Sequence, residues 1–268
     1  MSDPTPYCTV AVASTFSPRF VQVLAEAKRI RDRLQCDLHL IYVGETSDET
    51  TAKFRDVLAK LSLPLESTIH YQQGTPAEGI LQALTDHKID MIVAGALEKE
   101  VVLHPFLGNV ARRLVREATC SVMLFTHPEV EPKPLRKIVF VADYSNHALD
   151  ALRKTLQLAS AEKSERLYVI RVITAFDKAR ASLEGEAAQT SDDEEQELEK
   201  FVLSVGATEV PIEARCIRGN TGFAAADFVH SVEADLLVVP IPPSNDQSLP
   251  NNIAWITDVI PCNLWVIR

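Results

Sequence analysis

Cysteine is scarce in this chain, and its spacing excludes two kinds of structure. The five cysteines are scattered, odd in number and include no Cys-x-x-Cys pair. Disulfide frameworks use even sets of cysteines, and structural zinc sites use closely paired Cys or His ligands. The seven histidines contain no His-Glu-x-x-His sequence. We therefore expect no disulfide framework, no metal site and a reducing compartment, with the cytoplasm as the default location.

Long apolar runs and an excess of basic residues are also missing. No stretch approaches the roughly 18 apolar residues that a membrane helix needs, and residues 1–6 lack the features of a secretory signal. Asp and Glu outnumber Lys and Arg by 37 to 27, which gives a net charge of −10. Nucleic-acid binding needs clustered cations, and the one basic cluster is expected to be a solvated helix face: Lys28, Arg29, Arg31 and Arg33. We expect neither a membrane nor a nucleic acid as partner.

What the sequence does contain is an internal repeat. Five blocks recur in the same order. The first two pairs are 9–13 with 137–142 and 41–43 with 170–172, at an offset of 129 (172 minus 43). The next two are 74–76 with 219–221 and 89–93 with 234–238, at an offset of 145 (238 minus 93), and the last is 120–125 with 262–267, at an offset of 142 (267 minus 125). The sequence therefore predicts two copies of one domain, over 1–130 and 136–268, joined by a linker near 126–134. The change of offset places an insertion of 16 residues (145 minus 129) near 175–200 of the second copy.

Each copy alternates strand and helix patterns. In the first copy, helical periodicity begins at 20–27 and recurs over 49–61, 77–84 and 108–117, and strand patterns cover 9–13, 38–43, 67–71, 89–94 and 121–126. Such alternation implies parallel strands joined by right-handed crossovers. We predict an α/β fold of two tandem doubly wound domains, each a five-stranded parallel sheet flanked by helices.

The loop after the fourth strand is the candidate ligand site of the first copy, because open parallel sheets bind ligands outside the carboxyl ends of their strands. Gly95 begins this loop, and Gly108-Asn109 opens the next helix. Glycine lets a backbone approach phosphate closely, and a helix N-terminus offers amides and a positive dipole end. Asn109 could also cap that helix.

At these residues the chain resembles the universal stress protein family, and the resemblance covers nearly the full length as two copies. ATP-binding members carry Gly-x2-Gly-x9-Gly-Ser/Thr in this loop. The first copy is similar at Gly95 and Gly108, but it has Glu98 and Asn109 where the family has glycine and Ser or Thr. The resemblance also implies an adenine-nucleotide α-hydrolase-like fold.

Two further positions complete the candidate ATP site that the resemblance implies. The family's Asp at the end of the first strand falls on Ser14, and Val43 falls where the family places an apolar residue against adenine. The candidate cofactor-binding set is therefore Ser14, Val43, Gly95, Gly108 and Asn109. Glu98 would repel phosphate, and nearby arginines could offset this: Arg112, Arg113 and Arg116. ATP binding by the first copy stays open.

The second copy keeps the family's Asp, at Asp143, but has Pro240-Ile241-Pro242-Pro243 and Pro250 in its loop. Proline has no N–H to donate, so we predict that this copy does not bind ATP in the family manner. Asp143, Ser145 and His147 include acid, hydroxyl and base types, but a helix cap explains them better than a catalytic triad.

Three other features have plain structural explanations that we favour over functional ones. Cys120 and Cys262 are expected to be small buried side chains rather than redox centres. His39, in an apolar strand, is expected to be a hydrogen-bonded core residue rather than a metal ligand. The acidic insertion is expected to lead into a helix whose Leu198 and Phe201 face the core, although an acidic partner-binding element is the alternative.

These observations favour a non-catalytic stress-response protein that binds a small ligand or a protein partner. The apolar last strands, 122–125 and 264–267, are the expected seam of an internal pseudo-dimer, and a homodimer of the chain is compatible with this. The alternative is an ATP-binding regulatory switch in the first copy, with slow hydrolysis. An enzyme of the wider α-hydrolase type would need a fuller phosphate loop than either copy has. The catalytic set is therefore predicted to be empty.

Overall fold

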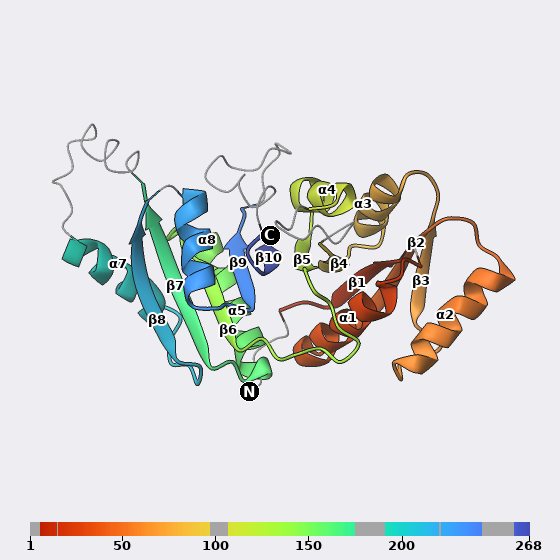
Figure 1. Cartoon of the computed structure of the whole chain (residues 1–268), viewed down its shortest axis with the longest axis horizontal. Helices are drawn as coiled ribbons and strands as arrows, with labels where there is room; N and C mark the ends of the chain where they lie inside the picture. Colours follow the sequence, from red (N-terminus) through yellow and green to blue (C-terminus); the bar gives the residue numbers. More distant parts are fainter. Residues whose placement is uncertain (1–5, 15, 97–106, 175–190, 220, 243–259) are drawn as a thin grey trace. The chain divides into compact units, whose positions relative to one another are not determined.

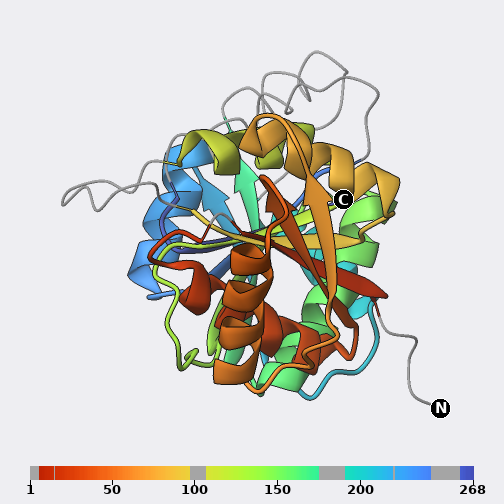
Figure 2. The ribbon, with the colours of Figure 1, turned by 90° about the vertical axis from the view of Figure 1, so that its right-hand side faces the viewer.

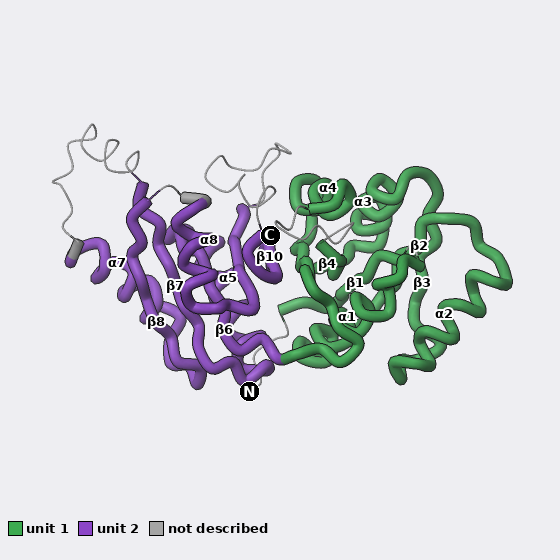
Figure 3. The backbone as a smooth tube through the Cα atoms, in the orientation of Figure 1, with its two compact units in different colours: residues 1–133 green, residues 134–268 purple. Residues whose placement is uncertain are grey.

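The structure is a computed structural model that describes residues 6–14, 16–96, 107–174, 191–219, 221–242 and 260–268. The chain divides into two compact units, Met1–Lys133 and Pro134–Arg268 (Figure 3). The boundary lies within the predicted proline-containing linker. Each unit is described by itself below.

Unit 1 has the element order predicted from its periodicity. Its elements are β1 (Thr9–Ser14), α1 (Phe20–Leu34), β2 (Asp37–Val43), α2 (Asp48–Lys60), β3 (Thr68–Gln72), α3 (Pro76–Asp86), β4 (Met91–Gly95), α4 (Asn109–Glu117) and β5 (Ser121–Phe125). Local signals set several helix ends. Ser47 accepts a hydrogen bond from the Thr50 amide and so caps α2, and Pro76 occupies the first position of α3, where its missing N–H costs nothing.

The unit 1 strands are parallel and lie in the order β3-β2-β1-β4-β5. The chain therefore moves outward twice from β1 and then returns to the other side of it. With right-handed crossovers, this puts α1 and α2 on one face of the sheet and α3 and α4 on the other (Figures 1 and 2). The central strand β4 is buried along nearly its whole length, which explains its continuous apolar run. The order reverses beside β1 and β4, and this is where a ligand site is expected.

Unit 2 repeats this arrangement. Its described elements are β6 (Lys137–Val141), α5 (Asn146–Glu162), β7 (Arg166–Ile173), α7 (Ser191–Leu203), β8 (Ile212–Arg218), α8 (Thr221–Ser231), β9 (Leu236–Pro240) and β10 (Asn263–Ile267). The strands are parallel in the order β10-β9-β6-β7-β8. The two units share one topology, so the predicted fold class of tandem doubly wound α/β domains is confirmed.

The strand pairing in the two sheets gives a different offset for the first strand than the sequence comparison did. Val12 pairs with Val93 in unit 1, and Phe140 pairs with Val238 in unit 2. Val12 therefore corresponds to Phe140, an offset of 128 (140 minus 12), whereas the sequence comparison aligned it with Val141. The apolar run in this strand is nearly uniform, so periodicity alone does not fix the register.

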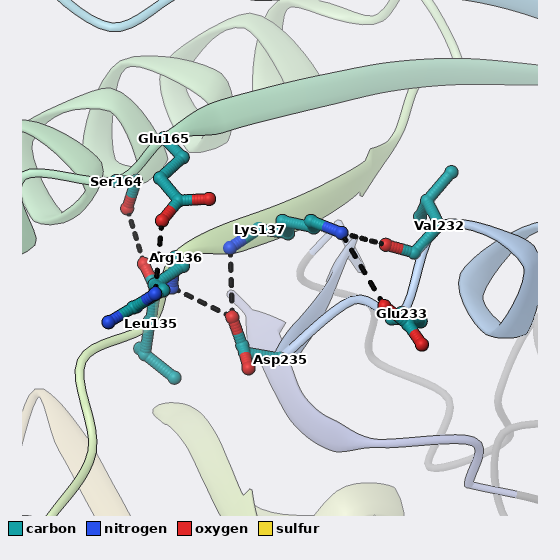
Figure 4. Close-up of polar contacts among 8 residues, drawn as sticks. All are labelled: Leu135, Arg136, Lys137, Ser164, Glu165, Val232, Glu233 and Asp235. Atoms are coloured by element: carbon teal, nitrogen blue, oxygen red, sulfur yellow. Dashed lines mark hydrogen bonds and ion pairs between the residues drawn. The ribbon is translucent and has the colours of Figure 1, made fainter.

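A pair of aspartates shows how closely the units correspond. In unit 2, Asp235 Oδ2 accepts hydrogen bonds from the Arg136 and Lys137 amides at 2.8 and 2.9 Å (Figure 4). In unit 1, Asp90 Oδ2 accepts from the amides of Cys8 and Thr9 at the same two distances. Each carboxylate thus joins the residue before the fourth strand to the start of the first strand. These hydrogen bonds are strong because their acceptor is charged.

Candidate functional site

Unit 1 contains a pocket at the point where its strand order reverses. The pocket has a volume of about 280 Å³ and lies at the carboxyl ends of β1, β4 and β5. The first two turns of α1, α3 and α4, residues 17–19 and Pro128 supply the rest of its wall. Representative lining residues are Ala13, Val23, Pro76, Gly95, Val110 and Phe125. This is the edge of the sheet where the topology predicts a ligand.

The wall of this pocket is mostly apolar. Among the described residues that line it, Ser17 and Arg19 carry the polar side chains. Three of the others, Pro18, Pro76 and Pro128, are prolines and have no amide hydrogen. The pocket thus combines apolar side chains with a smaller polar surface, an arrangement suited to a small molecule that carries both apolar and polar groups.

The structure places the two glycines predicted for a phosphate loop, Gly95 and Gly108, near each other, but the Gly108 amide already donates a hydrogen bond within the protein. The Gly108 amide donates a hydrogen bond to the Ala96 carbonyl at 3.0 Å, and the Ala96 amide donates to the Phe125 carbonyl at 2.9 Å. Gly95 lines the pocket, and a Cβ on it would lie 3.3 Å from Val23 Cγ2. Gly95 therefore keeps the pocket open, whereas the Gly108 amide closes the loop.

The expectation that Asn109 caps α4 is wrong. Gly108 is the N-cap residue, with extended backbone angles and no side-chain cap, and Asn109 is the first helical residue and exposed. An N-cap side chain must precede the helix to reach the amides of its first turn. Glu98 lies outside the described residues. Arg113 is engaged by Glu117 through two hydrogen bonds of 2.9 and 2.7 Å.

Ser14 and Val43 lie at the ends of β1 and β2, as predicted, but neither is among the described residues that line the pocket. Ser14 is buried, and its hydroxyl accepts a hydrogen bond from the Phe16 amide. Val43 packs under α3, since its Cγ2 would lie 2.9 Å from a Cβ on Gly79. Of the five candidate residues, the structure places Gly95 alone in the described lining.

An aromatic cluster beside the pocket was missed by the sequence analysis. The Phe16 ring lies 4.7 Å from Phe54, 5.3 Å from Tyr42 and 5.8 Å from Phe20, measured between ring centres. Phe20 belongs to both the cluster and the pocket wall. Phe16 has a left-handed backbone, with φ of 48°, a conformation uncommon for an aromatic residue. Aromatic residues in the sequence could have suggested a core here, but not this loop conformation.

Unit 2 builds a related cluster at the same loop. Tyr144, 128 positions after Phe16, also has a positive φ, of 62°. Its ring lies 5.6 Å from that of Phe201 on α7, and the Arg171 guanidinium lies 5.1 Å from its centre. Burial raises the pKa of the Tyr144 hydroxyl. A left-handed aromatic residue thus occurs at the corresponding position of both units.

The residues of unit 2 that could have formed a triad serve as a helix cap. Ser145 Oγ accepts a hydrogen bond from the Ala148 amide at 3.0 Å, and Asp143 Oδ1 accepts from the Ser145 hydroxyl at 2.6 Å. His147 Nε2 instead lies 3.1 Å from the Ile267 carbonyl. The predicted cap is confirmed. At the loop after β9, the Ile241 amide donates to the same Ile267 carbonyl, so this amide too is engaged.

The remaining polar candidates are structural in the described residues. Cys120 is buried, as predicted, whereas Cys262 is half-buried. Removal of the Cys262 thiol from water still raises its pKa, which makes it a poor nucleophile. In the described part of the chain, no three His, Cys, Asp or Glu side chains are arranged to hold a metal ion. Nor does any described helix have the length and apolar character to cross a bilayer.

His39 belongs to a stack of three histidines on the α3 face of the unit 1 sheet. His39 Nδ1 lies 3.0 Å from His70 Nε2, and the rings of His70 and His87 stack with centres 3.6 Å apart. His39 is hydrogen-bonded, as predicted, but it is half-buried rather than a core residue. Burial, helped by His87 and His39, lowers the pKa of His70 to about 4. Burial also lowers the pKa of His39, against the opposing charge of Asp37.

We expect this stack to destabilise unit 1 in mild acid. Because the folded-state pKa of His70 lies below its ordinary value, the unfolded state takes up the proton first, so stability is complete above pH ~6.5 and falls as the pH drops toward ~4. After allowance for solvent screening, the loss should be about 1–2 kcal/mol. Urea denaturation at pH 7 and pH 5 of the wild type and His70→Gln measures it. Equal losses in the two proteins would contradict the assignment.

Comparison with known proteins places this geometry in a family. The sequence profile described as "Universal stress protein family" matches residues 55–126 and 134–245. A curated universal stress protein of Thermus aquaticus is 36% identical over 92 residues, a match that covers 31% of this chain and 66% of the relative, just under two thirds of its length.

Solved structures show the same fold over both units. A universal stress protein from Archaeoglobus fulgidus aligns with a TM-score of 0.68 at 15% identity, covering 97% of this chain and 98% of that one. A functionally unknown protein from Pseudomonas aeruginosa aligns with a TM-score of 0.71 at 16% identity, covering 97% and 92%. The family profile matches more than half of the sequence, once in each unit. The chain therefore belongs to the universal stress protein family and carries two domains of that family in tandem.

Proposed function

We propose that this protein is a non-catalytic stress-response protein whose first domain binds a small, largely apolar molecule. The observation that carries the proposal is the pocket at the carboxyl ends of β1, β4 and β5, which Gly95 keeps open and apolar side chains line. Its volume of about 280 Å³ is near the lower limit of small-molecule sites, which begin at roughly 300 Å³. A concave site of this size supports a small ligand over a protein partner.

A triphosphate fits the described residues less well. Phosphate recognition by a glycine loop requires free backbone amides, and the Gly108 amide donates to the Ala96 carbonyl instead. In unit 2, Pro240 and Pro242 have no amide hydrogen, and the Ile241 amide between them is engaged. We therefore propose that unit 2 does not bind ATP.

ATP binding by unit 1 is the second candidate. Val110 and Ala111, in the first turn of α4, line the pocket together with Gly95. First-turn amides have no acceptor within their own helix, and a helix N-terminus favours an anion. The same end of the pocket could thus receive the anionic group of either a nucleotide or a small apolar acid.

Thermal unfolding in the presence of two probes distinguishes the candidates. The first probe is 2-naphthoate, a flat apolar carboxylate, and the second is Mg-ATP. A ligand at about ten times its Kd stabilises the folded state by about 1.4 kcal/mol, which raises the Tm of a domain of this size by about 3–5 °C. We expect this rise with 2-naphthoate, no rise with millimolar Mg-ATP and no phosphate release. A rise with Mg-ATP alone would overturn the proposal in favour of the switch.

A further inference from the structure

A nearly buried ion pair lies on α1 close to the end of unit 1. Glu26 and Arg29 are one helical turn apart, and Arg29 Nη2 lies 2.8 Å from Glu26 Oε2. Their side chains are only 5% and 10% exposed, so the expectation that Arg29 belongs to a solvated helix face is wrong. Charges removed from water to this degree need several good partners. We call this pair the clasp, and we call residues 127–133, which lead from β5 to the start of unit 2, the connector.

The clasp holds the connector at two points. Arg29 Nη1 donates a hydrogen bond to the Lys133 carbonyl at 2.7 Å, and the Glu129 amide donates a longer one, of 3.5 Å, to Glu26 Oε1. The first is short and charge-assisted, and bonds of this kind are among the stronger ones in proteins. The last residues of unit 1 are therefore fixed to α1 through charged groups.

The same clasp touches the wall of the pocket. The Arg29 guanidinium lies 5.7 Å from the centre of the Phe125 ring, a distance at which a cation and an aromatic ring attract. Phe125 lines the pocket, and so does Pro128 of the connector. One side of the pocket is thus formed by Phe125, which Arg29 contacts, and by Pro128, which precedes the residue whose amide bonds to Glu26.

Beyond the connector the chain is fixed again at once. The Leu135 amide donates to Glu162 Oε2 at 3.1 Å, and the Leu135 carbonyl accepts from the Ser164 hydroxyl at 2.6 Å (Figure 4 shows the second bond). Only Pro134 separates Lys133 from this residue. Because one residue alone separates the two anchored positions, a displacement of Lys133 relative to α1 is not absorbed by a flexible segment before Leu135.

We propose that the Glu26–Arg29 clasp couples ligand binding in the unit 1 pocket to the anchoring of the connector that leads into unit 2. The inference rests on the proposed function and adds its regulation. A bound ligand contacts Phe125 and Pro128 in the pocket wall. The clasp contacts the Phe125 ring and bonds to the amide of Glu129, next to Pro128. Coupling of this kind is reciprocal, so whatever the ligand does to the connector, loss of the clasp does to ligand affinity.

Hydrogen exchange and binding measurements on the full chain test the coupling. In the wild type, saturating 2-naphthoate should slow amide exchange of the connector. In Glu26→Met/Arg29→Met, which removes both charges of the pair together, the connector should exchange faster without ligand, and the Kd for 2-naphthoate should rise by about 5–10-fold. Asp150→Met/Arg153→Met is the control, because it removes both members of an ion pair of the same spacing on α5 whose side chains are exposed. Its Kd should equal that of the wild type.

The outcomes separate this inference from the function on which it rests. An unchanged Kd in the double variant would overturn the coupling and leave the ligand site intact. So would wild-type connector exchange that 2-naphthoate does not alter, a result that needs no variant to fold. Failure of 2-naphthoate to bind the wild type would overturn both.

Discussion

Gly95→Leu is expected to abolish binding of 2-naphthoate to unit 1. Gly95 lines the pocket, and its missing side chain leaves a gap next to Val23, whose Cγ2 would lie 3.3 Å from a new Cβ. A leucine side chain must occupy the space that the ligand would take. We expect the Kd to rise by about 100-fold or more, equivalent to roughly 2.7 kcal/mol of binding free energy.

A graded series makes this prediction sharper. Isothermal titration of Gly95→Ala, Gly95→Val and Gly95→Leu should give Kd values that rise with side-chain size, since the Cβ of alanine nearly fits. The Tm of each variant without ligand checks that the fold survives, because overpacking costs about 1–3 kcal/mol. A folded Gly95→Leu protein that binds 2-naphthoate as tightly as the wild type would refute the assignment of the pocket.

Phe54→Ala is expected to reduce the free energy of unfolding of unit 1 by about 3–5 kcal/mol. The Phe54 side chain is 1% exposed and lies against the rings of Phe16 and Tyr42. Its removal leaves a cavity that a loop already held in a left-handed conformation at Phe16 cannot easily fill. Urea denaturation measures the effect.

The matched control for Phe54 is a phenylalanine of unit 2 that packs little. Phe223 is 71% exposed, so Phe223→Ala should change stability by no more than about 0.5 kcal/mol. A loss below 1 kcal/mol in Phe54→Ala would mean that the aromatic cluster does not hold the β1–α1 loop. Because Phe20 belongs to both the cluster and the pocket, Phe54→Ala should also weaken 2-naphthoate binding.

The fold was predictable because it rests on patterns that recur twice in one chain. The continuous apolar run of β4, the proline at the start of α3 and the repeated order of blocks all indicated a parallel sheet with the observed element order. The register of the first strand was not predictable. Apolar residues fill both faces of a covered strand, and a shift of one residue from Phe140 to Val141 changes no pattern.

The candidate site was predictable in position but not in chemistry. The predicted parallel sheet placed it at the carboxyl ends of its strands, and Gly95, predicted as part of a phosphate loop, lines the pocket found there. The engagement of the Gly108 amide by Ala96 depends on backbone geometry that sequence does not show. Packing of Val43 against Gly79 depends likewise on how α3 crosses the sheet. The Glu26–Arg29 pair gave no signal beyond an ordinary helical spacing of charges.

Among the predictions from the sequence that stay predictions, two concern the structure directly. One is that the last strands, 122–125 and 264–267, join the two domains as a pseudo-dimer. The other is the effect of Glu98, which lies outside the described residues, on any anion near α4.

A crystal structure of the protein grown with 2-naphthoate, and a second grown with Mg-ATP, would test the central claim most directly. The account predicts that the aromatic rings of 2-naphthoate lie between Val23, Gly95 and Val110, and that Mg-ATP is not held by the amide of Gly108. A triphosphate bound at the Gly108 amide, with 2-naphthoate absent from the pocket in the other crystal, would contradict it.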